Sequence, residues 1–464
     1  AIIEISDGMN SSYKKIMFQL DSGIVDNYIT GDQIICKGFA PVLFRGSDLQ
    51  NTSYQWTYKE DSAAKFKTVT GIGTQYNFQP GTLQSSTSFK RIATRFSCTD
   101  TSNTISVHVK NNGLWMGAND AVWQVGSNWC GGLVPDTSTH VLVQQGQQIM
   151  ISNAYPNQSI SVKTITLDSS ANIVVNGLLH WPQTLLGKGT IDATSGSINI
   201  EKDSLIINPY VFKNKLIYTL QIDAKNKVQF LDSLIIANSI TLFNGSLQTK
   251  HLTLLPTAQI NSSGNNTAII GPATVHKSYH LKEGQTKLLS FPFLNQPSLL
   301  DFKKSVRITG KGGSSRGFDS AVHENASAHF LDTTTGTNAL LSFNPFTKMD
   351  SSFWEQNRAI KIWLYPNDTG FINETPFIET KKHNAWIHSS IDGIPQHGPL
   401  EIHFPEHPAA RYYLTGNPYP AAIDMRKISS STNIGKYYWY WDAGLGATGN
   451  YTASAFRFPK IIES

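Results

Sequence analysis

Charged residues are scarce in this chain of 464 residues, because Asp, Glu, Lys and Arg make up only 15% of it, against about 25% in soluble domains generally. Aromatic residues nevertheless reach 11% and apolar residues reach 40%. Intrinsically disordered chains combine high charge with few aromatic residues, so this composition excludes disorder for the chain as a whole.

Long apolar runs and clustered positive charge are missing as well. No apolar run approaches the roughly 20 residues of a membrane-spanning helix, so we expect no membrane span. Residues 1–4 lack the basic and apolar pattern of a signal peptide, and any export signal is expected to be cleaved or to lie outside this sequence. The net charge is +5, but its lysines and arginines are scattered. Because a duplex-binding face needs several phosphate contacts on one surface, we expect no nucleic-acid partner.

Uncharged polar residues take the place of the missing charge. Ser, Thr, Asn and Gln suit turns and the solvent-facing sides of strands, and they disfavour long helices. Stretches of Ala, Leu, Glu and Lys at helical spacing are hardly present. The sequence therefore predicts an all-β protein, and its length suggests about three domains.

Residues 1–112 are predicted to form a small β-sandwich. Apolar and polar residues alternate along 54–58, 89–96 and 104–109, which places apolar side chains on one side of each strand. A tryptophan in mid-domain, Trp56, followed by a strand that ends near a cysteine, suits such a sandwich.

Cysteine is rare, with three residues and no C-x-x-C pair. Cys36 and Cys98 flank the body of the first domain, and a disulfide between them would fit an oxidising exterior. Cys130 is then expected to be a partly buried free thiol.

Residues 113–275 are predicted to form a Trp-rich cap followed by a β-solenoid. The rings of Trp115, Trp123 and Trp129 stand beside glycine turns, where they either cover the open end of a sheet stack or form a platform for sugars; we favour the cover. From residue 136 onward, three-residue apolar strands recur at near-regular intervals between Asn, Gly and Ser turns. Short strands that cannot bury their own faces are typical of a solenoid.

Acidic residues in the solenoid occur about once per turn and at different phases, which favours a rigid spacer over a polysaccharide-cleaving groove. They are Asp168, Asp192, Glu201, Asp203, Asp223 and Asp232.

Residues 276–464 are predicted to form an antiparallel β-sandwich of two packed sheets. Its most aromatic strand alternates Tyr437, Trp439 and Trp441 on one face. These three rings either stack on glycans or are covered by neighbouring strands and loops, and the covered arrangement is slightly favoured. The loop 310–317 is rich in glycine and basic, but it lacks the G-K-[ST] ending of a P-loop.

Candidate catalytic and metal-binding groups do not form a pattern. His397, His403 and His407 lie close in sequence, yet the prolines between them argue against a shared zinc focus, and we expect structural histidines. The pairs Asp392 with Glu401 and Glu374 with Glu379 have no feature that would bring them together for glycoside hydrolysis. No G-x-S-x-G motif occurs, so we expect no enzyme and no cofactor.

Four short stretches stand out in the first domain: Ile35-Cys36-Lys37-Gly38, Tyr54-Gln55-Trp56, Phe89-Lys90-Arg91 and Ser97-Cys98. They resemble the Cys-x-Gly opening, the Tyr-Gln-Trp strand and the Tyr-x-Arg … Cys strand of the immunoglobulin-like repeats in multidomain cell-surface proteins of the Bacteroidota. The segment before their solenoids resembles Asn128-Trp129-Cys130-Gly131-Gly132-Leu133-Val134-Pro135, and their C-terminal motif resembles Gly416-Asn417-Pro418-Tyr419-Pro420.

The resemblance implies an immunoglobulin-like first domain and export by the type IX secretion system to the outer surface. The outer-membrane secretion machinery would then be a partner during export. Members of the group carry a C-terminal sorting domain, which does not appear before Ser464. We expect that it was removed after transport or lies outside this sequence.

The same bacteria attach O-glycans at Asp-Ser or Asp-Thr followed by a small or aliphatic residue. About half of the matching positions are expected to be used, since a buried strand serine would be inaccessible. The candidates are Ser62, Ser204, Ser233, Ser320 and Thr333.

The favoured function is that of a non-catalytic, secreted or cell-surface protein of adhesin or scaffold type. Its expected partners are surface glycans or other surface proteins. The alternatives are a carbohydrate-binding surface module and a cargo or accessory protein of the secretion or gliding machinery. A solenoid enzyme remains a third class, which an acidic groove would support.

Overall fold

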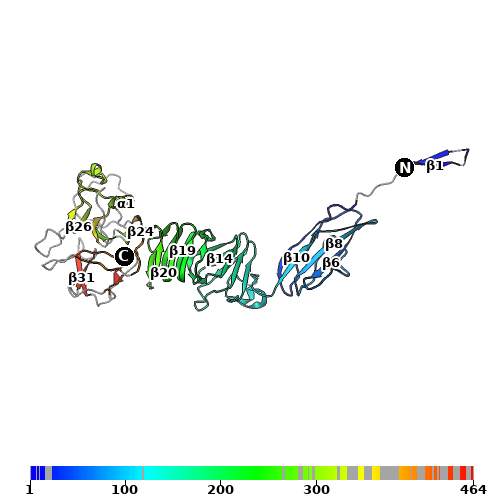
Figure 1. Ribbon diagram of the computed structural model, residues 1–464, viewed down its shortest axis with the longest axis horizontal. Helices are drawn as coiled ribbons and strands as arrows, with labels where there is room; N and C mark the ends of the chain where they lie inside the picture. The colour runs from blue at the N-terminus through cyan, green and yellow to red at the C-terminus, as the bar shows by residue number, and fades with distance from the viewer. Residues whose placement is uncertain are drawn as a thin grey trace. The chain divides into compact units, whose positions relative to one another are not determined.

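The protein is nearly all β, with 48% of the chain in strands and 6% in helices (Figure 1). The predicted fold class is therefore confirmed. The computed structural model describes residues 2–6, 8–9, 11–15, 23–117, 120–263, 267–280, 286–290, 292–294, 298–320, 324–331, 343–349, 358–365, 386–398, 400–404, 413–420, 423–425, 428, 437–442, 450–455 and 461–462.

The chain forms two compact units, each treated separately below. The first comprises Ala1–Asp120, Val125–Pro135 and Thr139–Leu142, and the second comprises Ala121–Gln124, Asp136–Ser138 and Val143–Ser464. The boundary predicted after residue 275 falls inside one strand, β24 (Ala273–His280), which pairs with a solenoid strand through its first three residues. The solenoid and the C-terminal region therefore belong to one compact unit.

An immunoglobulin-like β-sandwich occupies most of the first unit. One sheet has the strand order β4-β10-β8-β6-β7, with β9 beside β8, and a smaller sheet pairs β3 with β5. β4 runs parallel to β10, whereas the other pairs are antiparallel. The bounds are β3 (Ile29–Thr30), β4 (Gln33–Cys36), β5 (Arg45–Gly46), β6 (Ser53–Glu60), β7 (Lys67–Thr68), β8 (Thr87–Arg95), β9 (Cys98–Thr101) and β10 (Ile105–Lys110).

The core of the sandwich is aromatic. The alternation seen in the sequence sends every second side chain of β8 inward, which is the period of a strand with one buried face. Trp56 and Phe89 from the large sheet meet Phe44, and the Phe44 and Phe89 rings stand edge to face at 4.9 Å. Such ring pairs add to the free energy gained by burial. A separate antiparallel hairpin precedes the sandwich, formed by β1 (Ile2–Ser6) and β2 (Ser11–Lys15).

A β-solenoid of about six turns occupies residues 140–275. Its strands pair in parallel from turn to turn, as the predicted repeat requires. The bounds are β11 (His140–Val143), β12 (Gln148–Ile151), β13 (Thr164–Leu167), β14 (Asn172–Val175), β15 (Leu178–His180), β16 (Thr184–Gly187), β17 (Thr190–Ile200), β18 (Ile206–Ile207), β19 (Phe212–Phe230), β20 (Leu234–Gln248), β21 (Leu252–Leu254), β22 (Gln259–Ser262) and β23 (Ala268–Ile270).

Aliphatic side chains stack in columns inside the solenoid. One column pairs turn by turn through five strands and is almost completely buried: Leu179, Ile198, Leu220, Ile240 and Ile260. The corners require close backbone approach, and a Cβ on Gly245, which has φ of 73°, would collide with the carbonyl oxygen of Ala224.

The C-terminal part of the second unit consists of antiparallel sheets. β24 pairs with β29, and a four-stranded sheet has the order β25-β28-β26-β27. Two smaller sheets pair β30 with β33 and β31 with β32. The bounds are β25 (Thr286–Leu289), β26 (Ala328–Leu331), β27 (Phe343–Pro345), β28 (Ile360–Trp363), β29 (Trp386–Gly393), β30 (Ile423–Asp424), β31 (Tyr437–Asp442), β32 (Asn450–Ala455), β33 (Ile461–Ile462) and the helix α1 (Leu299–Lys303).

The Gly-Asn-Pro-Tyr-Pro segment joins this part to the solenoid. The side-chain oxygen of Asn417 accepts a hydrogen bond from the Tyr419 N–H at 2.9 Å, which closes a local turn. The Tyr419 hydroxyl donates to the Gly398 carbonyl at 2.8 Å, and the Pro420 carbonyl accepts from Ile260 of β22. The motif therefore acts as a structural clamp within the second unit.

Candidate functional site

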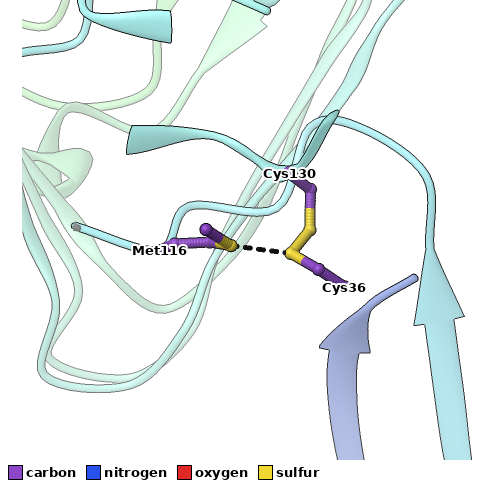
Figure 2. Close-up of a disulfide and its surroundings, with 3 residues drawn as sticks. All are labelled: Cys36, Met116 and Cys130. Carbon is purple, nitrogen blue, oxygen red and sulfur yellow. Dashed lines mark hydrogen bonds between the residues drawn. A yellow bond between two sulfur atoms is a disulfide. The ribbon is translucent and has the colours of Figure 1, made fainter. Parts of the chain in front are cut away.

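A disulfide joins Cys36 to Cys130, with the two Cα atoms 5.5 Å apart (Figure 2). The predicted Cys36–Cys98 pair is wrong, and so is the expectation that Cys130 is a free thiol. Cys36 is the last residue of β4 and lies beside Lys110, at the C-terminal end of β10. Cys98, in contrast, lies beyond the N-terminal end of β10. Cys98 is the free cysteine and is partly buried.

The disulfide borders a shallow depression of about 510 Å³ within the first unit. The Met116 side chain points at the disulfide, and its sulfur lies 2.8 Å from Cys36 Sγ (Figure 2). Phe39 and Trp129 form part of the wall. Two short 3-10 turns shape this segment, η1 (Gly126–Asn128) and η2 (Cys130–Gly132).

The three tryptophans of the connector are buried, with exposed fractions of 3% or less. Trp115 and Trp129 pair edge to face at 4.9 Å in the first unit. In the second unit, Trp123 donates its backbone N–H to Met150 of β12, so that residues 121–124 cover an edge strand of the solenoid sheet. Buried rings offer no face to a sugar, which agrees with the capping interpretation.

A row of ion pairs, the lysine row, follows one corner of the solenoid: Asp192, Lys213, Lys215 and Asp232. Lys213 Nζ lies 2.7 Å from Asp192, one turn away, and Lys215 Nζ lies 2.9 Å from Asp232 on the following turn. Lys215 also stands 4.2 Å above the ring of Tyr210, in the 3-10 turn η3 (Pro209–Val211). Each acid is thus matched to a lysine from a neighbouring turn.

Hydrogen bonds continue the same corner toward the C-terminal sheets. Thr249 donates to the carbonyl of Asp232 at 2.7 Å, His251 is 2.7 Å from the Thr274 hydroxyl, and Thr274 bonds to Asp392. These links bridge turns that are also joined by backbone pairing.

A second polar row, the amide row, consists of His180, Asn199, Glu201, Asp223 and Asn244. Glu201 accepts from Asn199 at 2.7 Å and lies 3.0 Å from His180 Nδ1. Asp223 accepts from Asn244 at 2.6 Å. The acids were expected at unrelated phases, but the structure collects several of them into two rows.

The pKa values of the two carboxyls in the lysine row favour a structural role over proton transfer. Burial opposes the ionisation of Asp192, but hydrogen bonds from Lys213 and Thr194 outweigh it and lower the pKa of this carboxyl. The hydrogen bond from Lys215, followed by the Ser233 N–H, holds the pKa of Asp232 far below its usual range. A general acid near neutral pH needs the opposite shift.

The histidines expected to be structural lie apart from these rows. Burial lowers the pKa of His397, and His403 is exposed, 3.9 Å from Glu401. His407, Glu374 and Glu379 lie outside the described residues. No cluster of three metal-binding side chains occurs in the described ranges, and none of the helices found there is long and apolar enough to cross a membrane.

The candidate glycan-stacking residues lie on β31, which pairs with β32. The side chains of Tyr437, Trp439 and Trp441 are outside what the structure describes. Among the glycosylation candidates, Ser62, Ser204 and Ser320 are exposed, Ser233 is half-buried, and Thr333 is outside the described residues.

A protein-family model matches part of the chain. Residues 25–111, which form the sandwich, match a domain of unknown function (DUF8696). No curated protein matches the chain.

Proposed function

We propose that this chain is a non-catalytic, secreted or cell-surface protein of adhesin or scaffold type, with the solenoid as its stiff element. The lysine row carries this proposal. Its carboxylates are neutralised by lysines from neighbouring turns of a solenoid that buries a continuous aliphatic column. At about 4.8 Å between turns, six turns extend for about 29 Å.

The surface location rests on the disulfide and on the Bacteroidota resemblance. A buried disulfide fits an oxidising compartment, where such bonds persist. We propose export through the type IX machinery. Protease treatment of intact cells of the source organism should digest the protein, and a strain without a working type IX translocon should retain it inside. Protection in normal cells would overturn the surface location.

The non-catalytic character is tested with candidate polysaccharides and a reducing-end assay on the full chain. We expect no new reducing ends above those of the D192N/D232N variant. Activity that this variant loses would place chemistry on the lysine row and overturn the proposal.

O-glycosylation at the exposed candidates is part of the same proposal. The intact mass of native material should exceed the polypeptide mass by several glycans. Replacing Ser62, Ser204 and Ser320 by alanine should remove part of that excess, and a bare mass in native material would reject glycosylation.

A further inference from the structure

One turn of the sandwich exposes an aromatic ring in an unfavourable backbone conformation. Arg95 pairs with Cys98, so a two-residue turn, Phe96-Ser97, joins β8 to β9. Phe96 has φ of 53° and is 82% exposed. Hairpin turns prefer Gly, Asn or Asp at such positions because a Cβ is penalised there. Phe96 therefore satisfies neither turn chemistry nor burial, and backbone outliers of this kind cluster at binding sites.

Phe96 borders an open depression of about 730 Å³. Among the lining side chains, Asp48 carries the single charge, and the rest are mostly amides and hydroxyls. The side chains of Asp48, Gln50 and Asn51 are exposed, and none of them bonds to another described residue. The full lining is Asp48, Leu49, Gln50, Asn51, Thr52, Ser53, Thr94 and Phe96.

A buried cation anchors the loop on one side of this depression. The Arg91 guanidinium is fully buried and donates to Ser47 Oγ at 3.0 Å. It also lies 4.4 Å from the centre of the Tyr54 ring. The Tyr54 hydroxyl accepts from the Leu49 N–H at 2.6 Å. The loop at 47–53 is thereby held in place before any ligand arrives, which reduces the entropy lost on binding.

We propose that this depression, the Phe96 site, binds a sugar residue of a neutral glycan. A pyranose has one face of C–H groups and a rim of hydroxyls. A flat exposed ring matches the face, and short amide and hydroxyl side chains match the rim. Asp48 accepts hydrogen bonds from neighbouring sugar hydroxyls and repels acidic glycans. The inference deepens the proposed adhesin function by giving the sandwich a ligand class.

The test measures binding of the full chain to immobilised neutral polysaccharides (a β-glucan, a mannan and a galactan), with polygalacturonate as the acidic probe. We expect binding to at least one neutral polymer and at least a tenfold loss in F96A and in D48A. F39A is the matched control, because Phe39 is an exposed phenylalanine of the same unit outside this depression. It should bind as the unmodified chain does.

Folding and location are separated from binding by two further comparisons. F96N should melt no lower than the unmodified chain and still lose binding, because asparagine tolerates this φ. The W439A/W441A variant should keep its binding to the neutral polymer. The proposal is overturned if the chain binds no neutral polymer, or if it binds only polygalacturonate or only other proteins. It is also overturned if F96A binds the neutral polymer as well as the unmodified chain does. Those outcomes leave the protease result on intact cells unchanged, so failure of the site and failure of the surface location are distinguishable.

Discussion

The sandwich buries one cation whose hydrogen-bond partners are neutral, whereas the solenoid has acids at its corners and pairs them with lysines. Arg91 is fully buried and donates to Asn27 and to the Tyr76 carbonyl. Desolvation lowers its pKa. Asp192 is nearly buried and Asp232 is partly exposed, and both pair with lysines and have lowered pKa values. The sandwich uses its charge to position loops, and the solenoid uses its charges to join turns that burial already holds together.

The largest expected effect is the loss of stability on removing the disulfide, which cross-links the first unit and not the solenoid. Removing both Cys36 and Cys130 by alanine substitution should lower the free energy of unfolding of the first unit by about 4.7 kcal/mol in the chain-entropy model, because the bridge spans 94 residues. Chemical denaturation followed by tryptophan fluorescence measures it. C98A should change stability little, and an equal loss there would contradict the pairing.

The next effect concerns the buried cation. R91A should destabilise the sandwich by about 3 kcal/mol, because Asn27 and the Tyr76 carbonyl lose charged hydrogen bonds inside the protein. R45A, which alters an exposed arginine of the same unit, should stay within about 0.5 kcal/mol. Equal losses in the two variants, measured by urea unfolding, would show that the Arg91 contacts contribute little.

The paired acids predict a pH dependence for the solenoid. Carboxyls with lowered folded pKa values stabilise above their unfolded pKa of about 4, and this contribution is lost as the pH falls through their folded pKa values. The melting temperature should therefore fall below pH 4. The D192N/D232N variant should show a flatter profile and only a small loss of stability near pH 7, because solvent screens such pairs. An unchanged profile would contradict the role of these pairs.

The smallest effect has the opposite sign. F96N should stabilise the sandwich by about 0.5 to 1 kcal/mol, because asparagine accepts the φ of 53° that phenylalanine resists. Thermal melting measures the gain, with F39N as the exposed control. Destabilisation by F96N would mean that the ring contributes to packing.

Local pattern was sufficient for much of the fold. The alternation in 89–96 and the aliphatic bursts of the solenoid predicted strands that the structure confirms, because burial of alternate side chains depends on neighbours in sequence. The pairing of Cys36 with Cys98 is wrong because, without the strand order, the sequence does not show that these two cysteines lie at opposite ends of the sheet.

The candidate site depended far more on three-dimensional contacts. Asp192 meets Lys213 and Asp232 meets Lys215 only because parallel pairing stacks residues about 20 positions apart. Phe96 lay inside a strand-like stretch, and nothing in the pattern marked it as exposed.

By itself the sequence determined the β class, the positions of many strands and the aliphatic repeat of the solenoid, since these follow from the chemistry of residues one or two positions apart. Tertiary structure decided the partner of Cys36, the rows of paired charges and the exposure of Phe96. Each of these depends on which distant strands become neighbours and on the ends of the sheet at which their residues meet.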